Sequence, residues 1–184
     1  MKIKTLFPFL LIVFLFLTGC EGAKYPLGDP NESSVEDQFI GSWIYESPDG
    51  DEESYLTLLE FNDHEYLGIS WNAGDEDELM MMQVFSTMVD GTAFANIKVL
   101  GSDEDEAAYF FFKYERASDD ELVVYAIDDD QYDELSELES AGAVRRFIEK
   151  RMADPEFFDD ESVIYRKLEE WAWPWEDGYG HWGH

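Results

Sequence analysis

Short runs of strand-forming residues, separated by turn-forming residues, recur along most of this chain and limit the folds open to it. Breaks such as Pro48-Asp49-Gly50 and Asp90-Gly91 contain the residues that favour tight turns. The alternation predicts strands at 42–47, 54–62, 65–72, 79–89, 93–100, 107–116, 121–127 and 162–168. Connections this short join neighbouring strands, so the order predicts an antiparallel, up-and-down arrangement.

One late stretch departs from this alternation. Residues 130–152 place apolar side chains at helical spacing, with an interruption at Ser140-Ala141-Gly142. Three aspartates, 128–130, precede the stretch, where carboxylates favour the N-terminal end of a helix dipole. The sequence therefore predicts a mainly β fold: an antiparallel up-and-down barrel of about eight strands, with a helical insertion before the last strand.

The order of elements resembles the lipocalin superfamily over residues 36–168. A short helical turn leads into Gly41-x-Trp43, antiparallel strands follow, and the last strand carries a basic residue, Arg166. In that family the tryptophan plugs one barrel end and a late arginine stacks over it. The resemblance implies that Trp43 and Arg166 form a barrel-closing pair. An unrelated small sheet with covering helices is the alternative that the sequence leaves open.

Strand alternation also predicts which side chains face the barrel interior. If Trp43 points inward, the patterns give a ligand-facing set of Leu67, Ile69, Trp71, Phe110, Phe112 and Tyr114. Because an eight-stranded interior holds packed side chains or one small ligand, these large residues predict little void. Tyr109 and Phe111 then face outward and need cover, for which the helix with Phe147 and Ile148 is a candidate.

The N-terminus has the features of an export signal. Lys2 and Lys4 precede an apolar run that is too short for a permanent membrane span. Leu17-Thr18-Gly19-Cys20 resembles the lipobox of bacterial lipoproteins, which implies cleavage before Cys20 and lipidation, palmitate included, on that cysteine. Cys20 is the only cysteine, so it has no pairing partner in an exported protein. Several acyl chains give stable anchoring.

This resemblance implies a cellular location, and the sequence pattern divides the chain into parts. Glu21 after the cysteine favours the periplasmic face of the outer membrane in a Gram-negative cell. The expected parts are a signal peptide at 1–19, a flexible tether at 20–34, a barrel domain at 35–169 and an aromatic, Gly-rich tail at 170–184. The tail contains Trp171, Trp173, Trp175 and Trp182, which we expect to cap a barrel end or contact a membrane interface. An ordinary secretory signal is the alternative.

Composition excludes several classes of protein. The chain has 43 acidic and 12 basic residues and a formal net charge of −31, so nucleic acid and anionic headgroups are poor partners. Its hydrophobic content of 45% and aromatic content of 16% exclude a disordered acidic chain.

Motifs of catalysis and metal binding are missing from the sequence. It has no Gly-x-Ser-x-Gly elbow, no phosphate-binding glycine loop, no His-Glu-x-x-His and no calcium loop with the required glycine and terminal glutamate. His64 is expected in an exposed turn. His181 and His184 could hold a transition metal weakly, but a frayed terminus is the simpler interpretation. We therefore predict no catalytic residue, no metal site and no cofactor.

Basic residues gather at Arg145, Arg146, Lys150 and Arg151. The cluster could contact phosphate, but the spacing of Arg145 and Glu149 favours local neutralisation along a helix.

Three functions remain open. The favoured one is a non-catalytic binding or interaction module, lipid-anchored to the cell envelope through Cys20, whose partner is an envelope protein or a small apolar ligand. The alternative is a carrier that holds a small apolar ligand in a lipocalin-like cavity. An unrecognised envelope hydrolase is the least favoured.

Overall fold

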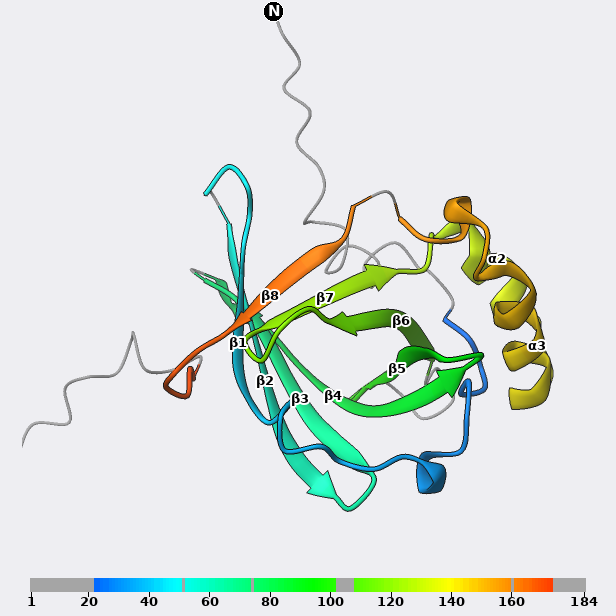
Figure 1. Cartoon of the computed structure of the whole chain (residues 1–184), viewed down its shortest axis with the longest axis horizontal. Helices are drawn as coiled ribbons and strands as arrows, with labels where there is room; N and C mark the ends of the chain where they lie inside the picture. Colours follow the sequence, from blue (N-terminus) through cyan, green and yellow to red (C-terminus); the bar gives the residue numbers. More distant parts are fainter. Residues whose placement is uncertain (1–21, 51, 74, 102–107, 160, 174–184) are drawn as a thin grey trace, which may run out of the picture.

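The computed structural model describes residues 22–50, 52–73, 75–101, 108–159 and 161–173. Its strands form a closed antiparallel barrel in sequence order, and the last strand pairs back onto the first (Figure 1). The predicted fold class is thereby confirmed. The strands are β1 (Gly41–Glu46), β2 (Glu53–Asn62), β3 (Glu65–Asn72), β4 (Asp75–Val89), β5 (Thr92–Val99), β6 (Tyr109–Arg116), β7 (Glu121–Ala126) and β8 (Val163–Lys167).

The two-residue connection between β4 and β5 shows how turn chemistry sets the register. Asp90 and Gly91 both have positive φ angles, 47° and 84°. Two positive φ angles in a two-residue loop are typical of a hairpin turn whose twist matches that of the flanking strands. The turn places Val89 directly opposite Thr92 and so fixes the pairing of the two strands.

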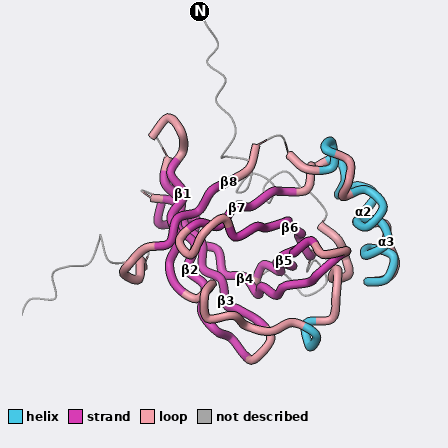
Figure 2. The backbone as a smooth tube through the Cα atoms, viewed as in Figure 1, coloured by secondary structure: helices cyan, strands magenta, loops and turns pink. Residues whose placement is uncertain are grey.

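Two helices lie between β7 and β8, as predicted: α2 (Asp130–Ser136) and α3 (Ala141–Arg151). A short 3-10 helix, η3 (Pro155–Phe157), follows them. Ser140 caps α3 by accepting a hydrogen bond from the Ala143 N–H. Both helices pack on one side of the barrel (Figure 2). Their fully buried Val144 and Ile148 share a hydrophobic cluster with Phe111 of β6. The expected cover for Phe111 is therefore present.

The segment predicted as a flexible tether packs against the barrel instead. Ala23 is fully buried and exchanges two backbone hydrogen bonds with Tyr109, of 2.9 and 2.8 Å. The N–H of Leu27, also fully buried, donates to the Asn96 side chain at 2.8 Å. The prolines and glycines that indicate a tether also suit an extended strap. A Cβ on Gly22 would lie 2.7 Å from that of Ala108.

This strap continues through η1 (Pro30–Glu32) towards β1. The Ser33 hydroxyl accepts a hydrogen bond from the Ser86 N–H of β4 at 3.1 Å. Ser33 therefore binds the strap to the barrel wall.

The other end of the described chain lies against the outer face of β1 and β2. The Ala172 carbonyl accepts hydrogen bonds from Ser42 and Thr57, at 3.4 and 3.2 Å, and its N–H donates to the Ser42 hydroxyl at 2.9 Å. The rings of Trp171 and Trp173 stack with centroids 6.0 Å apart. Trp175 and Trp182 lie outside the described residues.

Over the part of the chain that the structure describes, none of the helices combines the length and apolar character needed to cross a membrane.

Candidate functional site

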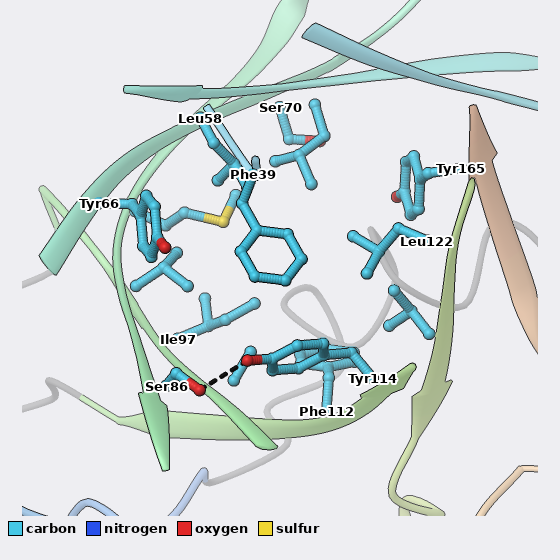
Figure 3. A pocket seen from close by; sticks show the side chains of 15 residues that line it. Phe39, Leu58, Tyr66, Ser70, Ser86, Ile97, Phe112, Tyr114, Leu122 and Tyr165 are labelled. Atoms are coloured by element: carbon cyan, nitrogen blue, oxygen red, sulfur yellow. Dashed lines mark hydrogen bonds between the residues drawn. The ribbon is translucent and has the colours of Figure 1, made fainter. Parts of the chain in front are cut away.

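The barrel encloses an apolar cavity of about 130 Å³ (Figure 3). Phe39, from the segment that enters β1, projects into its centre, while every strand from β2 to β8 contributes to the wall. The apolar lining residues are Phe39, Leu56, Leu58, Met82, Val84, Ala95, Ile97, Phe112, Leu122 and Val124, and the hydroxyl-bearing ones are Tyr66, Ser70, Ser86, Tyr114 and Tyr165.

Three of the residues predicted to face the interior lie on the outer wall. Leu67, Ile69 and Trp71 occupy the outer face of β3, because Ile69 lies directly opposite Thr57 and the Thr57 hydroxyl binds Ala172 outside the barrel. The Trp71 ring stacks on Tyr55 at 5.2 Å. The predicted orientation of β3 is therefore wrong, because the residues that alternate with the predicted ones face inward. The apolar side chains of β3 are covered from outside the barrel.

Two of the other three residues of the predicted set line the cavity. Phe112 and Tyr114 of β6 line the cavity. Phe110 alternates with them but packs against Tyr132 of α2, with ring centroids 5.5 Å apart, and does not line the cavity.

β3 presents two small residues, Gly68 and Ser70, on the face that lines the cavity. Tyr66 and Ser70 line it, and Gly68 lies between them. A Cβ on Gly68 would meet the Met82 side chain at 2.6 Å, so Met82 occupies the room that this glycine leaves. The interior is therefore less filled than the aromatic residues of the sequence indicate.

Three of the hydroxyls that line the cavity are hydrogen-bonded, and burial favours the protonated, uncharged form of the tyrosines. Tyr114 and Ser86 share a hydrogen bond of 2.6 Å, and the Tyr66 hydroxyl accepts from the Glu36 N–H at 2.7 Å. Burial raises the pKa of Tyr66 and of Tyr165 to about 12, and it also raises the pKa of Tyr114. Among the described residues, no carboxylate, histidine or lysine lines the cavity. Its wall can enclose an apolar group but offers no acid or base.

One end of the barrel, where β1 begins and β8 ends, is built around Trp43. This side chain is fully buried, and its indole N–H donates to the Phe39 carbonyl at 3.0 Å. The cation over its ring is Lys167, whose Nζ lies 5.2 Å from the centroid, and not the predicted Arg166. Lys167 is the register partner of Trp43, whereas Arg166 is exposed and pairs with Glu46 at 2.9 Å.

Arg145, Arg151 and His64 have local partners. Arg145 and Glu149 form the expected helical ion pair at 2.9 Å, and Arg151 contacts Glu134 at 2.8 Å. A ring nitrogen of His64 lies 2.7 Å from the Ser33 carbonyl oxygen.

No group of three or more metal-binding side chains occurs within the described ranges. Cys20, His181 and His184 lie outside them.

Comparisons with protein-family models, with curated proteins and with solved structures found no match to this chain.

Proposed function

We propose that this protein is a lipid-anchored protein of the cell envelope whose barrel binds a small apolar ligand without transforming it. The observation that carries the proposal is the apolar cavity inside the barrel. Its lining has neutral hydroxyls and no acid–base pair, which supports binding over catalysis.

The size of the cavity limits the ligand. An engineered protein cavity of about 150 Å³ lined by apolar side chains binds benzene. The cavity here, about 130 Å³, suits a group of similar size and is too small for a whole long-chain fatty acid. The closed barrel, with Trp43 buried at one end, supports a lipocalin-like arrangement adapted to a smaller ligand.

Binding can be tested on an unlipidated chain, defined as residues 20–184 with Cys20→Ser, which retains every described residue. Toluene should bind saturably and raise the melting temperature as its concentration increases. Ser70→Phe should abolish the effect by filling the cavity. Leu67→Phe, on the outer face of the same strand, is the matched control and should bind as the parent does. Absence of saturable binding by the folded parent would refute the proposed function.

The anchor is tested separately through Cys20. Cys20→Ala should give an uncleaved or soluble species without acyl chains, because the chain has no other thiol to lipidate. Metabolic labelling with palmitate and membrane fractionation measure the change. If the variant is acylated and sediments with membranes as the parent does, the proposed anchor is wrong.

A protein-docking role is the second candidate. Leu79 and Met81 of β4 and Leu100, which directly follows β5, are exposed, and the Leu100 N–H donates to the Met81 carbonyl at 2.8 Å. Adjacent exposed apolar side chains favour a partner surface. A photoreactive amino acid at Met81 should crosslink one defined envelope protein, whereas the same probe at Asp133 on α2 should not.

A further inference from the structure

A second hollow adjoins the apolar cavity at one end of the barrel. This cleft, of about 480 Å³, lies between the N-terminal strap, the β4–β5 hairpin and α3. Phe39, Ser86 and Tyr114 line both hollows.

The wall between the hollows consists of these three side chains. The Phe39 ring meets Tyr114 edge-on, with centroids 5.6 Å apart, and Tyr114 is hydrogen-bonded to Ser86 (Figure 3). Rotation of side chains alone can therefore connect cavity and cleft, since no strand has to separate. A ligand in the cavity could extend a second group into the cleft.

The charges that line the cleft determine which kind of chemical group a ligand can place there. Among the described residues, Asp29, Glu32 and Glu36 line it, against the single cation Arg145. The Arg145 guanidinium is already compensated, since it pairs with Glu149 and donates to the Met88 carbonyl at 2.9 Å. Hydrogen bonds from Asn31 hold the pKa of Asp29 below its usual value, so this carboxylate stays ionised at neutral pH. The cleft is therefore negative, while the cavity beside it is apolar and uncharged.

From this juxtaposition we infer that the ligand is a small cationic amphiphile. Its apolar part, about the size of a benzene ring or a six-carbon chain, occupies the barrel cavity, and its ammonium group lies in the cleft near Glu32 and Glu36. The inference rests on the proposed function and adds to it the chemical class of the ligand and the end of the barrel through which it enters.

The experiment compares three probes with one apolar chain and different head groups: hexylamine, hexanol and hexanoate. Calorimetric titration of the unlipidated chain at neutral pH should give the order amine, alcohol, carboxylate, from tightest to weakest. Glu32→Gln and Glu36→Gln should each weaken hexylamine binding about two- to fivefold, the range for an ion pair with an exposed carboxylate, and leave hexanol binding unchanged. Circular dichroism establishes that each variant is folded.

Asp133→Asn is the matched control, because Asp133 is an exposed acid on α2 that does not line the cleft. It removes the same charge from the overall field, so it should change hexylamine affinity less than either cleft variant. Hexanoate binding as tightly as hexylamine, or equal effects of Asp133→Asn and the cleft variants, would overturn the inference. Hexanol binding in either case leaves the proposed function intact, whereas failure of all three probes contradicts both.

Discussion

The ammonium group of Lys167 makes two contacts at the end of the barrel where β8 ends and β1 begins. It lies over the Trp43 ring and donates to the Gln38 carbonyl at 2.7 Å. It thereby joins β8 to the turn that enters β1.

Lys167→Ala should lower the free energy of unfolding by about 1–2 kcal/mol, because a cation–π contact and a charged hydrogen bond are both lost. Arg166→Ala removes only an exposed ion pair and should cost less than about 0.5 kcal/mol. Urea unfolding of the two variants measures the difference. An equal or greater loss for Arg166→Ala would show that the barrel end depends on the outer residue.

Tyr165 makes the stability of the barrel sensitive to alkaline pH. Burial raises its pKa to about 12, above the ordinary value of 10.0, so the folded state favours the protonated hydroxyl. The stabilisation of the folded state by Tyr165 is complete below pH 10 and is lost as the pH rises towards 12. Within that window one such group changes the free energy of unfolding by about 1.4 kcal/mol per pH unit.

Tyr165→Phe should therefore flatten the fall in stability above pH 10. Part of the slope should remain, because the pKa of Tyr66 is also raised to about 12. Denaturant unfolding between about pH 9 and 12 measures the slope. Tyr25→Phe changes an exposed tyrosine and serves as the control. An unchanged slope in Tyr165→Phe would contradict the assignment.

Single residues show where sequence patterns succeed and fail. Alternation within β6 correctly placed Phe112 and Tyr114 inward. The prediction succeeded because a helix was available to cover Phe111 on the outer face. The choice between Arg166 and Lys167 depended on the pairing register of β8 with β1, which a basic residue at each position does not specify.

At the scale of elements, the N-terminal strap is part of the folded domain. Leu27 is fully buried in a cluster with residues of the barrel and helices, and its backbone is held by Asn96.

Leu27→Ala should cost about 2–5 kcal/mol, the range for truncating a buried leucine. Tyr25→Ala, two residues earlier and 40% exposed, should change the stability by less than about 0.5 kcal/mol. Thermal and urea unfolding of the unlipidated chain compare them. If both variants match the parent, the strap does not contribute to the fold.

β3 is the element whose faces the sequence misassigned. A strand with one covered face shows its apolar side by alternation, but Ile69 and Trp71 are both 8% exposed although they lie outside the barrel. Thr57, which lies opposite Ile69 on this outer face, binds Ala172, more than 100 residues later in the chain. Local alternation cannot report a contact of this separation. The same limit applies to the strap, whose burial depends on β5 and β6.

At the scale of the whole molecule, the excess of acidic residues should make stability depend on salt. With a net charge of −31, repulsion among exposed carboxylates opposes the compact state. Raising sodium chloride to about 1 M shortens the Debye length to about 3 Å. The melting temperature of the unlipidated chain should therefore rise by several degrees, as calorimetry can measure. A flat or falling curve would show that the acids are compensated locally.

The barrel itself was predictable because its signals are local. Turn residues such as Asp90-Gly91 separate the strands, and Ser140 marks the start of α3. The cavity was not predicted, because the sequence pattern assigned Leu67, Ile69 and Trp71 to the inner face of β3, where the structure has Tyr66, Gly68 and Ser70. The clue in the sequence was the alternation of small residues with large ones along β3.

The docking of Ala23 has a consequence for orientation. In a chain lipidated at Cys20, as proposed, only Glu21 and Gly22 separate the anchor from Ala23, so the Cα atoms of Cys20 and Ala23 lie at most about 11 Å apart. Ala23 joins β6 at Tyr109, whereas Tyr114, in the wall of the cleft, lies about 17 Å further along that strand. The end of the barrel at which β6 begins would then lie nearest the bilayer, and the cleft at the other end would open towards water, so the protein would take its ligand from solution.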